Sequence, residues 1–342
     1  MRHSHIRPAI ITVFAVIAVL LPYITGNLYY LHVATVIGVY WVLIATLNLL
    51  VGFTGQLSVG HVGLLAIGAY AFCLLAGAQG WNPFLALLAG GAICAVIGLL
   101  LGLPSLRLPG FYFAMATLAF GLIVSELALA EQWLTNGSVG MPAPTFPAPF
   151  DTPWGFYWLV LGIAAFITWM TANLARFMWG RAMVALRDST VAASSVAIPI
   201  YRTKLIVFVF SGFTAGIAGG LYATSQSYIT PDAFIVNLGI YFFVAIIIGG
   251  RGVIIGPFIG AVVLAAIPEL VGPLAKYGTF FYGFILLVVV LVLPGGFGEL
   301  ISNLAAKLRR ERQVSTSIEP DLEQLQAAIR GRPHERNGPV TS

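Results

Sequence analysis

Ten long apolar runs, separated mostly by short turns, constrain this chain more than any other feature of its sequence. They cover about residues 9–25, 31–51, 57–78, 83–103, 111–131, 155–175, 204–224, 235–249, 254–272 and 279–294. A helix needs about 20 largely apolar residues to cross the hydrocarbon core of a bilayer. The runs therefore predict an all-α integral membrane protein with about ten transmembrane helices.

Charge is too scarce for a protein that folds in water. Hydrophobic residues make up 59% of the chain and charged residues only 8%, whereas a soluble domain carries about 25% charged residues. This composition excludes a soluble enzyme, a nucleic-acid binder and a disordered protein.

The basic residues fall in alternate connections between the runs. With an inside N-terminus, the inside segments hold Arg2, Arg7, Arg107, Arg176, Arg181, Arg187, Arg202, Arg251, Lys307, Arg309, Arg310 and Arg312. The outside segments hold Asp151 and Asp232, with Lys276 as a basic exception. Because Lys and Arg favour the cytoplasmic side, we expect ten helices with both termini cytoplasmic.

Two connections and the C-terminal end depart from the pattern of short turns. We expect a transmembrane domain over residues 1–300 and a charged cytoplasmic tail over 301–342. Within the domain, an outer loop at about 132–154 is rich in Pro, Gly, Asn and Thr, and an inner loop at about 176–203 is long and basic.

Motifs for chemistry are missing. A P-loop places a lysine directly after glycine, but Lys204, Lys276 and Lys307 follow threonine or alanine. The chain has no His-Glu-x-x-His zinc helix, and His61 has no carboxylate or cysteine at ligand spacing. We therefore expect no catalytic residue, metal site or cofactor, and no enzymatic activity in this chain.

The segment 52–61 carries several polar side chains into a span that should be apolar, among them Gln56, Ser58 and His61. Polar groups at membrane depth are costly and tend to face a cavity or a partner helix. A glycine-interrupted helix also frees backbone groups, which is tolerated only beside protein or water. Interhelical hydrogen bonds alone remain an open interpretation, but as a group these residues favour a lined pathway.

Glu126 lies toward the outer part of the fifth run and is followed by Glu131 and Gln132. Two interpretations are open: the side chain extends to the outer membrane interface, or it belongs to a pathway. The sequence shows no regular series of intramembrane carboxylates, which weakens a proton-coupled mechanism.

Small residues recur at helical spacing. Gly212-x-x-x-Gly216-x-x-x-Gly220 places three glycines along one helix stripe, and Gly98-x-x-x-Gly102 and Gly256-x-x-x-Gly260 repeat the pattern. Glycines at this spacing let helix backbones approach closely in a bilayer, so we expect a large, compact bundle.

The inner loop contains an amphipathic segment, Gly180 to Asp188, followed by Ala192-Ala193. We expect a short helix lying across the cytoplasmic face. Such a helix either rests on lipid headgroups or docks a cytoplasmic motor, because the chain carries no motor of its own.

Four motifs in order along the chain resemble the permease subunits of branched-chain amino-acid ABC importers, of the LivM type. They are Ser58-Val59-Gly60-His61 with Gly68-Ala69-Tyr70, Thr135-Asn136-Gly137-Ser138-Val139-Gly140 before Pro142, Ala185-Leu186-Arg187-Asp188 with Ala192-Ala193, and Gly249-Gly250-x-Gly252 with Gly256-Pro257 and Gly260-Ala261. Together they span roughly residues 50–300.

The resemblance implies a type II importer bundle in the bacterial inner membrane. It implies a second related permease subunit, two cytoplasmic ATPases that bind ATP and Mg²⁺, and a periplasmic or lipid-anchored substrate-binding protein. Membrane lipid is a further partner, and nucleic acid is not. The cargo would be leucine, isoleucine or valine, moved by alternating access.

The resemblance and the polar pattern together name two sets of candidate residues. The pathway set is Gln56, Ser58, His61, Tyr70, Glu126 and Asn136, and the ATPase-coupling set is Arg181, Leu186, Arg187, Asp188, Ala192 and Ala193.

The chain also departs from the family pattern. Leu122 and Ser125 stand where the family often has Glu and Arg, Asn136 replaces the first glycine of the outer motif, and Ala197 replaces a glycine. Leu122 and Asn136 leave other cargo open, such as urea, short amides or other amino acids. A different class also remains open: a self-sufficient secondary transporter that uses Glu126 or His61.

Overall fold

The computed structural model of the chain describes residues 26–105, 107–108, 110–271, 280 and 283–284. Eight of the ten predicted apolar runs correspond to described helices. The run at 9–25 and nearly all of the run at 279–294 lie outside the described residues, as does the tail from 301 to 342.

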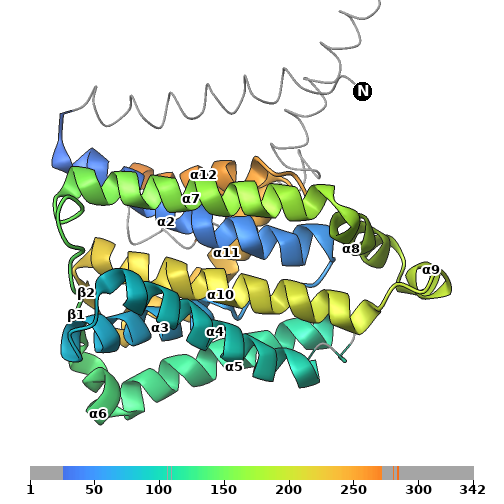
Figure 1. Ribbon diagram of the computed structural model, residues 1–342, viewed down its shortest axis with the longest axis horizontal. Helices are drawn as coiled ribbons and strands as arrows, with labels where there is room; N and C mark the ends of the chain where they lie inside the picture. The colour runs from blue at the N-terminus through green and yellow to red at the C-terminus, as the bar shows by residue number, and fades with distance from the viewer. Residues whose placement is uncertain (1–25, 106, 109, 272–279, 281–282, 285–342) are drawn as a thin grey trace, which may run out of the picture. The chain divides into compact units, whose positions relative to one another are not determined.

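Helices dominate the described part of the chain (Figure 1). They are α2 (Leu28–Asn48), α3 (His61–Phe72), α4 (Pro83–Ser105), α5 (Gly110–Ala130), α6 (Gln132–Thr135), α7 (Pro153–Arg176), α8 (Met178–Asp188), α9 (Thr190–Ser195), α10 (Ile200–Gln226), α11 (Val236–Gly249) and α12 (Gly256–Val271). Two π-helical segments, η1 (Leu49–Phe53) and η2 (Cys73–Ala78), extend α2 and α3, and η3 (Gly137–Val139) and η4 (Pro231–Phe234) are short 3₁₀ turns.

Seven of the described helices are long and apolar enough to cross a membrane. They are Leu28–Phe53, His61–Ala78, Pro83–Ser105, Gly110–Ala130, Pro153–Arg176, Ile200–Gln226 and Pro231–Gly249, and Gly256–Ala266 is a shorter apolar helix. Asn27 is the N-cap of α2, because its side chain accepts a hydrogen bond from the Tyr29 N–H at 2.9 Å.

The chain is not helical between η1 and α3, so α3 begins four residues later than the run at 57–78 predicts. Residues 55–59 have no helical structure. Gly239, in the early part of α11, lies directly against the carbonyl of Val59, and His61 contacts the middle of α10 through Ser211. The chain therefore returns from the end of η1 into the middle of the bundle before α3 starts.

Helix α10 forms the centre of the bundle and packs against α2, α3 and α4. The glycine stripe predicted from the sequence makes these contacts. A Cβ on Gly212 would lie 2.9 Å from the carbonyl oxygen of Cys94, and one on Gly216 would lie 2.8 Å from the carbonyl oxygen of Gly90. Because glycine has no Cβ, α10 and α4 can approach to backbone contact.

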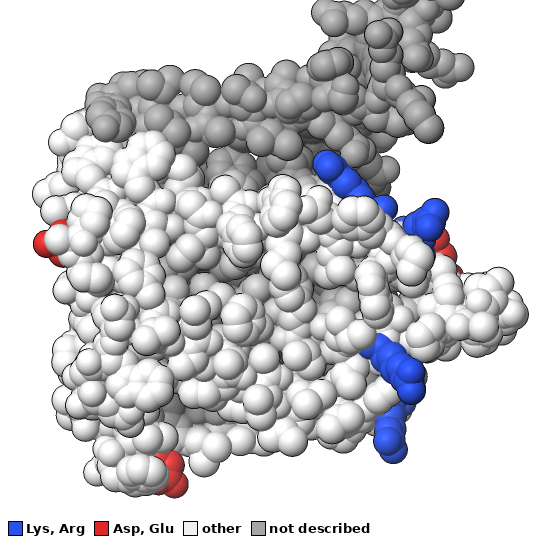
Figure 2. All heavy atoms as spheres, in the orientation of Figure 1, with Lys and Arg blue, Asp and Glu red and all other residues white. Residues whose placement is uncertain are grey.

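The Lys and Arg residues of the described chain lie toward one end of the bundle, where Asp188 is also found. Arg187 contacts the end of η1, and Tyr201 donates to the Leu103 carbonyl near the end of α4 at 2.7 Å. These contacts bring the turns that hold Arg107, 176–199 and Arg251 to one end, here called the basic end. Figure 2 shows the Lys and Arg side chains of one face gathered there.

The opposite end holds the connections that contain Asp151 and Asp232 and is here called the acidic end. A small antiparallel pair of strands closes it. Strand β1 (Met141–Pro142) pairs with β2 (Tyr228–Ile229), with Met141 opposite Ile229. The Tyr228 hydroxyl also donates to the Val139 carbonyl at 2.7 Å. The 132–154 connection is thereby fastened to the end of α10.

Gly68 provides a test of the close packing between α3 and α10, because a Cβ there would overlap the backbone of Gly216. We expect Gly68→Ala to lower the free energy of unfolding by about 1–3 kcal/mol, the range for overpacking a tight contact. The measurement is thermal or denaturant unfolding of the purified protein in detergent. Gly162→Ala is the matched control, since nothing lies within 4 Å of a Cβ at that position; equal stability of the two variants would contradict the packing argument.

Candidate functional site

His61 is the centre of a hydrogen-bonded group in the middle of the bundle. Its Nδ1 lies 2.9 Å from the Ser58 hydroxyl, and its Nε2 lies 2.8 Å from the Ser211 hydroxyl of α10. The edge of the ring meets Phe208 at 5.7 Å between ring centres. His61 is 1% exposed. Both ring nitrogens therefore have partners, and the residue joins the start of α3 to α10.

The non-helical segment before His61 is also bonded to α5. The Val59 N–H donates to the Thr117 hydroxyl at 3.3 Å, and Gly60 sits so close to the Thr117 backbone that no Cβ would fit. These contacts supply partners for backbone groups that a broken helix leaves free at membrane depth.

Gln56 and Tyr70 carry polar atoms that these networks do not satisfy. Gln56 Oε1 and the Tyr70 hydroxyl are buried and find no hydrogen-bond partner among the residues that the structure describes. Buried polar atoms in native proteins nearly always have a partner, in the protein or in water. These two buried atoms of the predicted pathway set have bonding capacity left for water or cargo.

Tyr70 belongs to an aromatic cluster toward the acidic end. Phe234 of η4 lies between two tyrosines, with ring centres 6.0 Å from Tyr70 and 5.7 Å from Tyr222. Tyr222 also stacks on Tyr40 at 6.3 Å. The cluster joins α2, α3 and α10 to the short η4 turn.

Glu126 is exposed on α5 within a helix long enough to span the membrane. Its neighbours one turn away, Leu122 and Ile123, are exposed too, at 45% and 57%. A carboxylate on such a face requires water, lipid headgroups or another chain beside it. The structure separates Glu126 from the His61 group, because the buried face of α5 carries Thr117.

Asn136 and Ala197 both adopt left-handed backbone conformations, with φ of 59° and 57°. Glycine takes this conformation freely and Asn tolerates it better than most residues. Asn136 ends α6, and its side-chain amide donates to the Gly140 carbonyl at 3.2 Å. The left-handed backbone conformation explains why the family motif favours glycine at both positions.

The 176–203 connection forms two helices, α8 and α9, at the basic end (Figure 1). As the amphipathic pattern predicts, α8 has an apolar buried face, which includes Met183 and Leu186 and packs against α7, α10 and η1. Since the chain itself covers this face, it is not the surface on which α8 would rest on lipid.

The six residues of the predicted coupling set take different positions. Leu186 and Ala193 are buried, at 2% and 1% exposed. Arg187 turns toward the bundle, where Nη1 donates to the Gly52 carbonyl at 3.0 Å. Arg181, Asp188 and Ala192 are exposed. These last three can touch another protein without rearrangement, and so can the exposed 38% of the Arg187 side chain.

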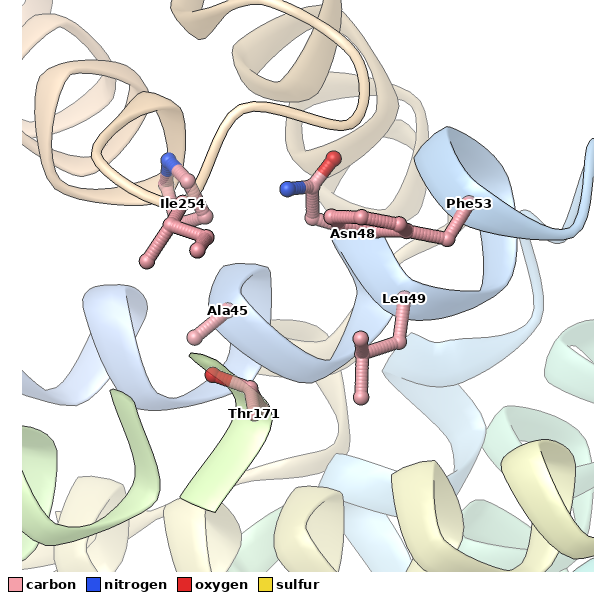
Figure 3. A pocket seen from close by; sticks show the side chains of 7 residues that line it. Ala45, Asn48, Leu49, Phe53, Thr171 and Ile254 are labelled. Atoms are coloured by element: carbon pink, nitrogen blue, oxygen red, sulfur yellow. The ribbon is translucent and has the colours of Figure 1, made fainter. Parts of the chain in front are cut away.

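Asn48 lies where α2 passes into η1, close to the turn between α11 and α12 (Figure 3). Its amide accepts from the Gly252 N–H at 2.9 Å and donates to the Val253 carbonyl at 3.0 Å. Beside it is a cavity of about 10 Å³, lined in part by Ala45, Thr171 and Ile254, which has room for a single water molecule.

A model of the permease component of branched-chain amino-acid transport systems matches residues 29–293. The match covers most of the chain and all seven candidate membrane spans. The chain belongs to this permease family.

Named relatives agree with the family. The permease is 31% identical to the high-affinity branched-chain amino-acid transport permease LivM of Salmonella typhimurium and 30% identical to that of Escherichia coli, in each case over 77% of this chain and 68% of the relative. It is also 28% identical to the autoinducer 2 import permease LsrC of Klebsiella pneumoniae, over 65% of this chain and 66% of the relative. No solved structure matches.

The permease is therefore a multi-pass protein of the bacterial inner membrane and a subunit of a transport system. The prediction of the family from the Ser-Val-Gly-His, outer-loop, Ala-Leu-Arg-Asp and late glycine motifs is confirmed. The prediction of the cargo is not settled, because relatives that import autoinducer 2 share much of the same chain.

Sequence reasoning did not single out Ser211, Thr117 or Asn48. Each is a polar residue within or at the end of an apolar run, which is the signal that drew attention to His61. Their partners lie 58 to 205 residues away in the sequence, so only the fold shows what they bind.

Ser211 allows a direct test of the histidine network. We expect Ser211→Ala to lower the free energy of unfolding of the permease by about 1–3 kcal/mol, because His61 Nε2 would be left buried without a partner. Ser195→Ala is the matched control, since this exposed serine bonds only within its own helix, and we expect a change within about 0.5 kcal/mol. Equal unfolding midpoints for the two variants would contradict a stabilising role of the His61 network.

Proposed function

We propose that the permease is a membrane subunit of an ATP-binding-cassette importer that carries leucine, isoleucine and valine into the cytoplasm. The observation that carries this proposal is the identity of about 30% to two LivM permeases over 77% of the chain. On this proposal the full protein has ten transmembrane helices in a type II importer bundle, with the basic end and both termini in the cytoplasm. The charge separation between the two ends supports that orientation.

Cargo crosses by alternating access beside a second, related permease subunit. Exposed apolar faces of α4 and α5, which include Leu100 and Phe111, supply surface for that subunit or for lipid. Gln56 and Tyr70 contribute polar groups near the pathway, and Ser58 and His61 hold the broken helix that supports them. A binding protein delivers cargo to the acidic end, where Asn136 shapes the outer turn.

Two partner ATPases bind ATP and Mg²⁺ and dock at the basic end. Helix α9 carries the exposed apolar residues Val191 and Ala192, with Val196 directly after it. Arg181 and Asp188 add exposed charges on α8. Exposed apolar side chains rimmed by polar groups are typical of a protein contact, which supports docking at this loop.

The same kind of importer could carry other cargo. The LsrC relatives import autoinducer 2, and permeases for urea, short amides or other amino acids would require the same bundle. A secondary transporter that uses His61 is disfavoured, because both nitrogens of that ring already have serine partners. Glu126 keeps that alternative open, since it is an exposed carboxylate on a spanning helix.

Uptake of radiolabelled leucine into proteoliposomes tests the function. The vesicles hold the permease and its second permease subunit, with the ATPases present or omitted and the binding protein added outside. We expect uptake only with ATP and both ATPases, because the chain has no motor of its own. Uptake without the ATPases would refute the importer. Binding-protein-stimulated ATP hydrolysis without leucine uptake would keep the importer and refute the cargo.

Glu126→Gln tests the pathway position. We expect ATP-driven uptake to fall at least about fivefold, which corresponds to roughly 1 kcal/mol, because the variant removes the carboxylate charge that the predicted pathway set contains. Glu131→Gln is the matched control, since Glu131 lies beyond the end of α5 and accepts from Trp133 Nε1. Unchanged uptake would assign Glu126 to the membrane interface, and loss of wild-type uptake when the proton gradient alone is collapsed would favour a secondary transporter.

A further inference from the structure

Arg187 belongs to the loop that we place against the ATPases, and its partly exposed side chain also bonds the end of η1. Nη1 donates to the carbonyl oxygen of Gly52 at 3.0 Å, and Nε bonds Asp188 Oδ1 at 3.1 Å. The side chain is 38% exposed, against 64% for Asp188. A guanidinium bonded in this way holds the end of α8 to the end of η1 with two of its five N–H donors.

The acceptor exists because α2 ends in an unusual way. The last residues form a π-helical turn, in which the Thr54 N–H bonds the Leu49 carbonyl and the Gln56 N–H bonds the Leu50 carbonyl. A helix terminus leaves carbonyls without donors from its own turn. Arg187 supplies a charged donor to the Gly52 carbonyl, and hydrogen bonds that involve a charged group are roughly twice as strong as neutral ones.

Glycines make room for the Arg187 side chain on two sides. A Cβ on Gly55 would lie 3.1 Å from Arg187 Cγ, and one on Gly252 would lie 3.2 Å from Arg187 Nη1 and from the Gly52 oxygen. Both glycines also have positive φ, 71° and 75°, which other residues rarely adopt. The guanidinium therefore sits where α8, η1 and the α11–α12 turn meet.

Asn48 extends the connection to α11 and α12. Through Gly252 and Val253 its amide binds the turn between these helices from the side of α2. Displacement of Arg187 would therefore act on two elements at once: the end of the first described span, and the turn that sets the positions of α11 and α12.

We propose that Arg187 is the positioning residue that transmits movement of the α8–α9 loop to α2, α11 and α12. This inference rests on the proposed function, because it needs ATPases that move the loop. The exposed residues of α9 make the contact with the ATPase, and Arg187 carries the displacement inward through the Gly52 carbonyl and the Asn48-bound turn. Replacement of Arg187 uncouples the two without releasing the ATPase.

The test compares hydrogen exchange and coupling in the complete complex, reconstituted with its second permease subunit and ATPases. Exchange is followed at residues 189–195, 48–56 and 250–256, before and after addition of ATP with vanadate. In the wild-type complex we expect nucleotide to change exchange in all three segments. In Arg187→Gln we expect the change at 189–195 to persist, and the changes at 48–56 and 250–256 to be lost.

Three further variants make the result specific. Arg187→Lys retains a cationic donor, so we expect part of the exchange response at 48–56 and 250–256 to return. This variant also keeps the fold if the glutamine variant is unstable. Arg202→Gln removes an exposed arginine at the same end and should behave as wild type. Val191→Asp alters the exposed face of α9 and should release the ATPases on purification, which Arg187→Gln should not.

Transport supplies the second readout. We expect Arg187→Gln to lower the amount of cargo moved per ATP hydrolysed by roughly tenfold, within the usual range of coupling between two sites. A wild-type exchange response in that variant, or loss of the ATPases from it, would overturn the inference. A wild-type permease that binds no ATPase at all would instead overturn the proposed function, and this inference with it.

Discussion

The interior of a bilayer offers no water to backbone N–H and C=O groups. The rest of this structure depends on how the chain supplies partners for these groups where a helix is interrupted. Residues 55–59 are not helical and lie between η1 and α3. They are tolerated because α5, α10 and α11 surround them. Thr117 bonds the Val59 N–H, and Ser211 fixes His61 at the start of the next helix. Close packing of glycines with neighbouring backbones brings these donors and acceptors within reach.

The same solution appears at the basic end, where a π-helical turn ends α2. There the partners come from far along the chain, because Arg187 bonds the Gly52 carbonyl and Asn48 bonds the α11–α12 turn. A break in a helix thus becomes a junction of three elements. Such a junction is stiff when complete, since each bond orients a group that is also held by its own helix.

Much of the architecture was predictable from single residues and their spacing. The apolar runs located eight helices, the glycine stripe of α10 identified its contact face, and the alternation of Met183 and Leu186 with polar residues identified α8 as amphipathic. Asn136 and Ala197 show the limit of motif reading, because their departure from glycine became interpretable only with the backbone angles. The coupling set was predicted as one surface, but Leu186 and Ala193 are buried and Arg187 bonds the Gly52 carbonyl.

The sequence by itself determined that this chain is a membrane protein that resembles importer permeases. It also determined the positions of the helices along the chain and the segments that carry charge. Those properties are local: they depend on the composition of a window about as long as one membrane span. Only the tertiary structure decided that both nitrogens of His61 are satisfied, that Gln56 and Tyr70 keep buried polar atoms free of partners in the described part of the chain, and that Arg187 bonds the Gly52 carbonyl. Hydrogen bonds between residues many helices apart depend on helix packing, and helix packing is a property of the whole bundle.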